Sequence, residues 1–470
     1  KRQPQHLRLK DKLNLPTPHN SEYELKKHVK RILVKNKTCD EYLNFLGGGC
    51  WQHYVPAICD EIISRSEFLT AYGGTTYSTF GRMQAQFEFQ SLMGELLDMD
   101  VVSEGSYIGV HIERSVDYVT CILGILKANA AVVPLPPSYP TERLRSILAF
   151  AELDLLVDSR TNPIDQSVGV HAKSLEDLMA EDAPATSFAE GKPAQAAFVL
   201  CSSGSTGTPK MIVRSHDSFF HRLEWTWREH PFADGDVGCQ KAHMTTTHSL
   251  YELFEPLLAG APTVLIGDQQ TRQLEEFWSV VRAEGVTRLL LVPSALRASL
   301  DMPDFSPPPV RVLVLMGEYL PAELAERALS AFPSETSIYS IYGSTEASST
   351  LLCDLRRHFR TGKDLPLGEP ISDDIKVLIR TPDGEPVPSG ERGRLFIAGR
   401  ALFTEYYRDP ELTASAFTSL PGREDKVYDT RDDVRRLPTG ELCFLARTDE
   451  TVKVRGFRVD LPEVEGAIRS

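Results

Sequence analysis

The 470-residue sequence lacks several features that would mark a membrane, secreted or zinc-binding protein. No apolar run approaches the roughly 18 residues that a spanning helix needs, so we expect no contact with a membrane. The residues that follow Lys1 contain no apolar signal-peptide core. Eight scattered cysteines form no Cys-x-x-Cys pair. This argues against a zinc site and a disulfide framework, and it favours a cytoplasmic location.

Acidic residues outnumber basic ones after the first segment of the chain. The net charge is −14, yet residues 1–37 hold 11 Lys and Arg against three acidic residues, so the remainder carries −22. An acidic body of this kind disfavours nucleic-acid binding, and we expect no nucleic-acid partner. The basic arm is expected to be a solvated tail, with contact to an acidic partner as the alternative.

The pattern of apolar and polar residues changes along the chain. From residue 103, strand-like and helix-like apolar patterns alternate, which predicts an α/β fold with parallel sheets covered by helices. Near residue 372 the pattern changes to hairpins joined by Pro-Asp-Gly and Pro-Thr-Gly turns. We therefore expect a basic arm over residues 1–37, a helical segment over 38–102, a core over 103–371, a small β subdomain over 372–448 and the start of a further lobe over 449–470.

Several elements can be placed within this outline. A helix is expected near residues 22–34, a short one at 57–64, and an amphipathic one at 82–97. The core should contain helices at 116–127 and 141–151. Its expected strands are 108–112, 130–135, 153–157, 196–200, 211–213, 263–266, 289–292, 310–315 and 338–342, and those of the β subdomain are 375–380, 394–399 and 441–446.

A loop rich in glycine and hydroxyl groups separates the strand-like runs 196–200 and 211–213. Its glycines let backbone N–H groups turn inward toward an anion, and its hydroxyls and lysine add donors and charge. This composition favours a phosphate-binding loop, with a solvated turn as the alternative. The residues that we assign to the loop are Ser202, Ser203, Gly204, Ser205, Thr206, Gly207 and Lys210.

Residues 40–101 carry a separate sequence resemblance. The stretches FLGGGCWQHYVPAICDEIISRSEFLTAY and MQAQFEFQSLMGELLDMDV resemble the N-terminal part of the glycine-cleavage-system P-protein, a pyridoxal-phosphate glycine decarboxylase. That family carries its Schiff-base lysine far downstream, and the pattern does not continue after residue 102. The resemblance therefore transfers no catalytic residue, and it favours a scaffold role for this segment.

Six further motifs stand before and after the glycine- and hydroxyl-rich loop. They are, in order, LKANAAVVPLPPSYPTER (126–143) before the loop, and SIYGSTE (340–346), LPLGEP (365–370), YDTRDD (428–433), RTD (447–449) and KVRGFRV (453–459) after it. Together they resemble the adenylate-forming superfamily, and most closely the adenylation domains of nonribosomal peptide synthetases. The resemblance implies a large lobe of layered, parallel-type sheets plus a small β subdomain, here preceded by the helical N-terminal segment.

That resemblance implies a reaction in which a carboxylate attacks the α-phosphate of ATP and pyrophosphate leaves. The loop with Lys210 would hold the outer phosphates, Thr345 would contact the α-phosphate, and Glu346 would bind Mg²⁺. Tyr342 would offer a face for adenine and Asp432 would accept hydrogen bonds from the ribose. Gly343 and Arg447 complete the implied nucleotide site. Taken singly, each residue has a structural alternative: a core tyrosine, a turn aspartate or an ion-paired glutamate.

The acid pocket implied by the same resemblance lies downstream of the loop. Relatives that activate α-amino acids carry at its first position an Asp that pairs with the substrate ammonium, and Thr247 stands there in this chain. His248 next to it, neutral or cationic, would suit a hydroxyl or a second carboxylate, unless it points away from the ligand. The full set is Thr247, His248, Tyr251, Val314, Met316, Ile341, Ser349 and Thr350.

The C-terminal motifs imply a second half-reaction. Asp449 resembles the hinge about which a C-terminal lobe rotates before a carrier-protein phosphopantetheine thiol takes the acyl group. The family's C-terminal lobe normally supplies a second lysine, and we expect this chain to be incomplete for full activity. Another departure is Met211, where a glycine usually follows the loop lysine.

The sequence predicts an acid–thiol ligase that uses ATP and Mg²⁺, a small carboxylic or amino acid, and a carrier protein. The alternative acceptor is CoA, as in a stand-alone acyl- or aryl-CoA synthetase. Two interpretations from different functional classes remain open: a pyridoxal-phosphate fragment resembling a glycine decarboxylase, and a non-catalytic nucleotide-binding module.

Overall fold

The computed structural model of the protein describes residues 21–33, 35, 105–165, 172–180, 191–202, 210–360, 365–381, 384–418, 425–437, 440–449, 451–454, 457–461 and 468. The chain divides into two units, Lys1–Ala85 and Gln86–Ser470. In the first unit the described part is Ser21, helix α1 (Glu22–Leu33) and Lys35, and the helix confirms the one predicted there. The helices predicted at residues 57–64 and 82–97 lie outside the described residues.

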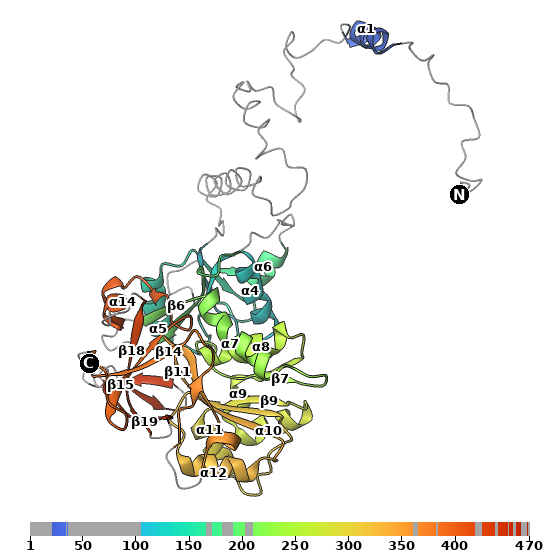
Figure 1. The fold of residues 1–470 in the computed structure, drawn as a ribbon. Helices are drawn as coiled ribbons and strands as arrows, with labels where there is room; N and C mark the ends of the chain where they lie inside the picture. Colours follow the sequence, from blue (N-terminus) through green and yellow to red (C-terminus); the bar gives the residue numbers. More distant parts are fainter. Residues whose placement is uncertain are drawn as a thin grey trace. The chain divides into compact units, whose positions relative to one another are not determined.

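The second unit contains a seven-stranded sheet in the order β16-β6-β5-β2-β1-β3-β4 (Figure 1). The pairs β1–β2, β1–β3, β2–β5 and β3–β4 are parallel, as predicted. The pairs β5–β6 and β6–β16 are antiparallel. The edge reverses because the loop between β5 and β6 is shorter than a parallel crossover requires. The strands are β1 (Tyr107–Val110), β2 (Ala131–Pro134), β3 (Leu155–Asp158), β4 (Ala172–Ser174), β5 (Ala196–Ser202), β6 (Lys210–Ser215) and β16 (Glu405–Tyr406).

Helices cover both faces of this sheet. One face packs against α4 (Val116–Lys127), α7 (His216–Glu229) and α8 (Thr247–Leu258), and the other against α5 (Thr141–Ala151). Hydroxyl side chains cap three of these helices: Ser115 begins α4, Ser215 begins α7 and Thr246 begins α8. The predicted helices 116–127 and 141–151 are confirmed residue for residue. The short α6 (Leu175–Ala180) follows β4.

A second sheet of five strands has the order β13-β12-β11-β10-β9, with β9, β10 and β11 parallel. All five residues of β10 are buried, as expected for a central strand with covered faces. Leu313 and Leu315 pack toward α10, α11 and α12, and the alternate residues of β10 pack in a separate cluster on the opposite face. The strands are β9 (Arg288–Leu291), β10 (Val312–Met316), β11 (Ser337–Ser344), β12 (Ser348–Asp354) and β13 (Glu369–Pro370).

The remaining elements of this region flank the second sheet. Strands β7 (Gly238–Gln240) and β8 (Thr263–Leu265) form a parallel pair. The helices are α9 (Asp268–Arg272), α10 (Leu274–Ala283), α11 (Pro293–Leu300), α12 (Ala322–Ala331) and α13 (Leu355–His358).

A third, antiparallel sheet occupies the segment in which a β subdomain is predicted. Pairs β14–β15 and β18–β19 are the expected hairpins. Strand β16 comes from the same segment, yet it joins the first sheet beside β6. The elements are β14 (Lys376–Arg380), β15 (Arg392–Ala398), α14 (Pro410–Ala416), β17 (Phe417–Thr418), β18 (Val427–Arg436) and β19 (Leu442–Arg447), followed by the pair β20 (Thr451–Val454) and β21 (Phe457–Asp460).

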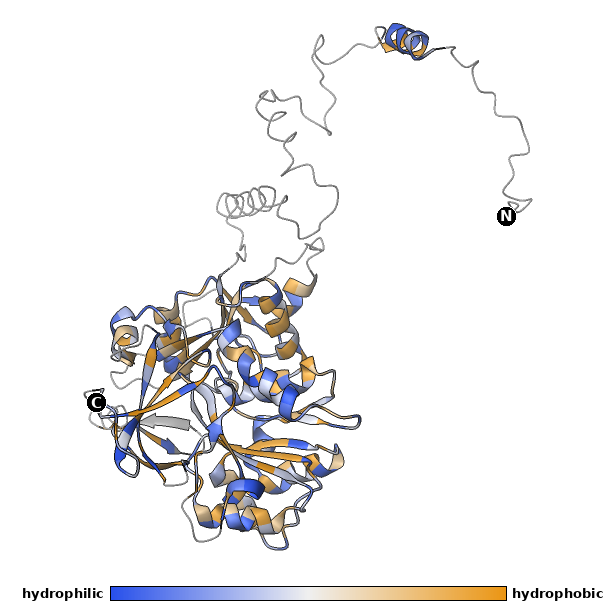
Figure 2. Cartoon of the chain, in the orientation of Figure 1, coloured by the Kyte–Doolittle hydropathy of each residue, from blue (hydrophilic) through white to orange (hydrophobic). Residues whose placement is uncertain are grey.

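Figure 2 shows apolar residues concentrated on the strands of the second sheet, while the helices that cover the strands carry mixed faces. This is the pattern expected when helices bury one stripe against a sheet and expose the other. Among the described residues, no helix combines the length and the apolar character that crossing a membrane requires.

A buried carboxylate ties together the ends of two strands in the second sheet. Asp236 is 4% exposed and accepts hydrogen bonds from Arg288 Nε at 3.2 Å and Thr287 Oγ1 at 2.9 Å. Arg311 Nε also donates to it at 2.9 Å. Burial alone would raise the pKa of Asp236, but the hydrogen bonds from Arg311, Ala233 and Thr287 outweigh burial and lower the pKa well below its ordinary value.

Asp236→Asn is expected to lower the free energy of unfolding by about 3 kcal/mol or more, because it leaves the buried Arg288 guanidinium without its countercharge. Because the pKa of Asp236 is lowered in the folded state, its contribution is complete above about pH 4 and is lost as the pH falls further. Urea unfolding across this pH range measures both effects. Asp301→Asn, which breaks an exposed pair with Arg327, is the control and should change stability little. Equal losses of unfolding free energy in the two variants would contradict the role of Asp236 as the countercharge of Arg288.

Candidate active site

The β5–β6 hairpin frames the loop that is predicted to bind phosphate. Ser202, at the end of β5, pairs in register with Lys210, at the start of β6. Lys210 is half-buried. Ser203, Gly204, Ser205, Thr206 and Gly207 lie outside the described residues, so their phosphate-binding role stays a prediction.

Three of the predicted nucleotide-binding side chains meet where β11 ends beside the third sheet. Tyr342 donates a hydrogen bond through its hydroxyl to Asp432 Oδ2, and Arg447 donates to Asp432 Oδ1 at 2.9 Å. Burial raises the pKa of Asp432, and the nearby Arg447 opposes that rise. Burial, and then the Asp432 charge, raise the pKa of Tyr342 well above 10, so Tyr342 keeps its proton and acts as the donor at neutral pH.

Gly343 has a local structural reason to be glycine. It lies at a bulge between β11 and β12, where an added Cβ would come 1.9 Å from the carbonyl oxygen of Ser348. Ser348 itself adopts a left-handed conformation, with φ 58°. Backbone strain of this kind gathers at functional sites. The close approach of the two strands fixes the turn that carries Thr345 and Glu346.

The predicted hinge residue is held by the same arginine that contacts Asp432. Arg447 donates from Nε to Asp449 Oδ1 at 2.8 Å and from its terminal nitrogen to Oδ2 at 2.7 Å, a fork-to-fork arrangement. Just beyond the hinge, Lys453 Nζ lies 3.4 Å from the carbonyl oxygen of Gly343. The residues predicted to bind the nucleotide and the start of the C-terminal segment are therefore in direct contact.

The turn with Thr345 and Glu346 rests on a residue that the sequence did not reveal. Arg214, on β6, is 1% exposed and donates to the carbonyl oxygens of Thr345 at 3.0 Å and Glu346 at 3.3 Å. It also donates to Ser218 at 2.6 Å and Ala401 at 2.9 Å. Its only sequence signal is a charge inside an apolar strand. The Glu346 side chain is fully buried, and Tyr406 donates to its Oε1 at 3.1 Å.

The predicted acid-pocket residues lie on four elements of the second unit. Thr247, His248 and Tyr251 lie on α8, Val314 and Met316 on β10, Ile341 on β11, and Ser349 and Thr350 on β12. Val314, Met316 and Ile341 share one apolar cluster. The hydroxyls of Tyr251 and Ser348 are hydrogen-bonded, which joins α8 to β12.

His248 is a neutral side chain in this pocket. Burial, and then the positive charges of Lys453, Lys241 and Arg222, lower its pKa to about 3. Its ring lies against Gly317, where an added Cβ would come 2.7 Å from Cε1. Of the two protonation states that the sequence left open for His248, the structure favours the neutral one.

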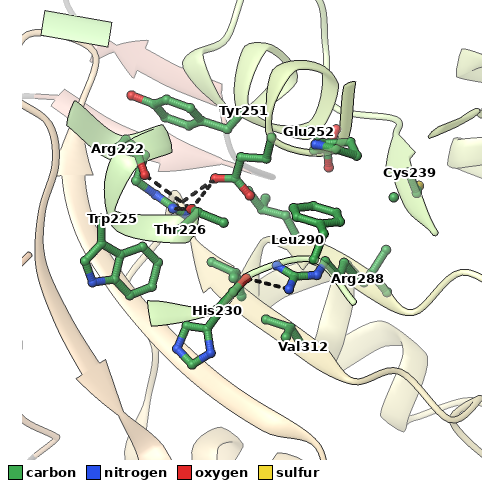
Figure 3. Close-up of a pocket in the computed structure, with 16 residues that line it drawn as sticks. Arg222, Trp225, Thr226, His230, Cys239, Tyr251, Glu252, Arg288, Leu290 and Val312 are labelled. Atoms are coloured by element: carbon green, nitrogen blue, oxygen red, sulfur yellow. Dashed lines mark hydrogen bonds and ion pairs between the residues drawn. The ribbon is translucent and has the colours of Figure 1, made fainter. Parts of the chain in front are cut away.

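A cavity of about 40 Å³ is lined by Tyr251 and Val314, two of the residues predicted for the acid pocket, among others (Figure 3). Its wall includes Arg222 and Glu255, two charged residues that the sequence analysis did not single out. Within the part of the chain that the structure describes, no group of three or more His, Cys, Asp or Glu side chains is placed to hold a metal ion.

Two families match the chain. The AMP-binding enzyme family matches residues 78–407, beginning before the expected start at residue 103. The glycine cleavage system P-protein family matches residues 1–108, a longer stretch than the expected 40–101. The two matched regions overlap, and they bear out both sequence resemblances.

Known proteins that are similar to the chain include parts of much longer synthases. Bacitracin synthase 3 of Bacillus licheniformis is 30% identical over 81% of this chain, which spans 6% of that synthase. A solved nonribosomal peptide synthetase, FmoA3 in its AMPPNP-bound form, has a TM-score of 0.67 and 25% identity, covering 77% of this chain and 39% of that one. A structure with adenylation and PCP domains, 23% identical, has a TM-score of 0.69, covers 82% of this chain and 66% of that one, and shares the fold.

His248 is expected to stay neutral from pH 8 down to about pH 4, because its folded-state pKa is about 3. The unfolded chain binds this proton more readily, so folding stability should fall as the pH drops below about 6.5. His248→Gln should make that slope shallower by up to one proton. Imidazole NMR of the wild type, with the variant used for assignment, measures the titration directly. A His248 signal that titrates near pH 6.5 would refute the burial argument.

Proposed function

The chain belongs to the AMP-binding enzyme family, and from this premise we propose that it activates a small carboxylic acid as an acyl-adenylate. A carboxylate oxygen attacks the α-phosphorus of ATP, a P–O bond forms, and pyrophosphate leaves. The acyl group then passes to the phosphopantetheine thiol of a carrier protein, with release of AMP. The observation that carries the proposal is the cluster of Tyr342, Asp432 and Arg447 at the end of β11.

In this proposal the cluster binds the nucleoside of ATP. The Asp432 carboxylate accepts hydrogen bonds from the ribose hydroxyls, and Tyr342 presents its ring to adenine. Arg447 holds Asp432 in position from the opposite side. The contact of Lys453 with Gly343 brings a positive charge beside the same site. Little covalent chemistry is asked of these residues, whose task is to position two anions.

Thr345, Glu346 and Lys210 act on the phosphates. Thr345 contacts the α-phosphate, and Lys210 and the loop before it hold the outer phosphates as charge develops. The Glu346 carboxylate is an oxygen ligand of the kind that Mg²⁺ prefers, and its burial favours a nearby cation. When bound, Mg²⁺ offsets phosphate charge. Arg214 positions both Thr345 and Glu346 through their carbonyl oxygens.

The acid has an uncharged substituent at its α-carbon. The eight residues proposed for the acid pocket include no Asp or Glu, so none of them supplies a countercharge for an α-ammonium group. Thr247 offers a hydroxyl instead, and His248 is neutral. A hydroxyl or keto group fits this chemistry better than an ammonium group.

A carrier protein is preferred over free CoA as the acceptor. The support is the likeness to FmoA3, a nonribosomal peptide synthetase, and to bacitracin synthase 3, of which this chain spans a small part. Asp449 acts as the hinge between the two half-reactions, and its fork with Arg447 supports that role. Loading of a carrier protein compared with loading of CoA separates this proposal from an acyl- or aryl-CoA synthetase.

Lys210→Ala and Glu346→Gln are each expected to lower ATP–pyrophosphate exchange by about 100-fold or more, because each removes charge stabilisation from the phosphates. The measurement is exchange over a panel of acids, made on the longest natural form of the chain. Lys192→Ala, at an exposed position before β5, is the matched control and should leave exchange unchanged. Undiminished exchange in the first two variants would show that the phosphate site lies elsewhere.

Thr247→Asp is expected to shift acid preference toward α-amino acids by about 10-fold or more, because it restores a countercharge for the ammonium group. The readout is the ratio of kcat/KM for an α-amino acid to that for the corresponding α-hydroxy acid. Thr247→Ser keeps the hydroxyl and serves as the control. A ratio that is the same in both variants would place Thr247 away from the acid's α-carbon.

A further inference from the structure

The cavity beside Tyr251 lies between helices α7 and α8 on one side and strands β9 and β10 on the other (Figure 3). Leu290 and Val312 give it an apolar wall, and Trp225 adds an aromatic one. Arg222 and Glu255 form an ion pair at 2.9 Å in that wall. At about 40 Å³ the cavity has room for a group the size of a hydroxyl or a carbonyl, or for one or two waters.

Two elements lead from the acid pocket into this cavity. On α8, Thr247, Tyr251 and Glu255 are spaced four residues apart, so they lie along one face of the helix. The first belongs to the proposed acid pocket, the second lines both spaces, and the third lines only the cavity. The helix rises about 12 Å over this stretch.

Strand β10 repeats the same progression. Met316, Val314 and Val312 alternate with residues of the opposite face, so they point to one side of the sheet. Met316 belongs to the proposed acid pocket, Val314 lines both spaces, and Val312 lines the cavity. A helix and a strand thus define the same direction, and the cavity lies at the far end of the acid pocket.

The charges around the cavity are paired. Arg222 faces Glu255, Arg288 faces Asp236 at 3.2 Å, and Lys241 faces Glu252 at 3.1 Å. The Thr226 hydroxyl donates a second bond to Glu255, at 3.0 Å. A carboxylate entering the cavity would meet Glu255, and an ammonium group would meet Arg222 and Arg288. The cavity therefore favours an uncharged group.

One donor in the wall has no partner. Arg222 is 1% exposed, and within the described part of the chain its Nε–H makes no hydrogen bond. A buried donor of this kind is costly unless a ligand or a water satisfies it. An oxygen atom with a lone pair is the complementary group.

We propose that this cavity receives the distal end of the substrate's side chain and binds an uncharged oxygen acceptor there, a hydroxyl or carbonyl oxygen, through Arg222. The inference rests on the proposed function, because it takes the pocket above the cavity to be the acid pocket. The substrate is then a carboxylic acid that keeps the uncharged substituent at its α-carbon and whose side chain has an apolar stem and a polar, uncharged tip.

The test uses acids that differ only at the tip. Given the rise of about 12 Å along α8, the probes are α-hydroxy acids of about five to ten carbons that carry a second hydroxyl at the ω-carbon, each compared with the α-hydroxy acid of equal length that lacks the ω-hydroxyl. At the matching length the acid with the ω-hydroxyl should be preferred by about 10-fold or more in kcat/KM for pyrophosphate exchange. The assay uses the longest natural form of the chain.

Variants assign that preference to the cavity. Arg222→Lys keeps a positive charge opposite Glu255 but removes the Nε–H, so the preference should fall toward one. If that variant is unstable, Arg222→Met combined with Glu255→Gln removes both buried charges together. Val312→Phe fills the cavity and should lower kcat/KM for long acids relative to short ones. Arg228→Lys, at an exposed position on α7 outside the cavity, is the matched control.

The outcomes separate the inference from the function on which it rests. Exchange with the acids but no preference for a hydroxyl tip would overturn the inference and leave the proposed function in place. A preference that persists in Arg222→Lys and in Val312→Phe would mean that the cavity holds water only, which also overturns the inference. Absence of exchange with every acid, α-amino acids included, would overturn the proposed function and the inference together.

Discussion

One buried guanidinium holds the site together. Arg214 lies on β6 of the first sheet, and its side chain donates to carbonyl oxygens in the turn between β11 and β12 of the second sheet. It also donates to Ser218 on α7 and to Ala401 in the segment that follows β15 of the third sheet. These partners are carbonyl oxygens, so the charge is dispersed over backbone dipoles. The two terminal nitrogens of Arg214 make all of these contacts, and because losing such acceptors is costly for a buried guanidinium, the relative position of the three sheets at this point is tightly specified.

Much of the fold follows from local signals in the sequence. Helix α4 begins and ends where predicted because Ser115 caps it and the apolar pattern stops at Lys127. The buried strand β10 is evident from its unbroken apolar run. The antiparallel edge at β5–β6 is less evident, because strand direction depends on the length of the connection and not on the strands themselves. The return of β16 to the first sheet depends on tertiary packing, which no local pattern encodes.

The candidate site also contains some residues that the sequence indicated and others that only the structure revealed. Tyr342, Asp432 and Arg447 stand in motifs, so they could be selected before the structure showed them in contact. Arg222 stands on a helix with charged neighbours, where an arginine ordinarily reads as a solvated residue. Only the packing of α7 against α8 and the second sheet turns it into the wall of a cavity. The P-protein match over residues 1–108 confirms a resemblance that the sequence already indicated, although most of that segment lies outside the described residues.

The fork of Arg447 has a thermodynamic consequence. One guanidinium holds Asp432 with one nitrogen and Asp449 with two others. A change at either carboxylate alters the geometry that Arg447 can adopt toward the other. The two positions are therefore energetically coupled. Such linkage is reciprocal: whatever a ligand at Asp432 does to the backbone conformation at Asp449, that conformation does in equal measure to the affinity for the ligand. A shared side chain makes the two sites a single thermodynamic unit.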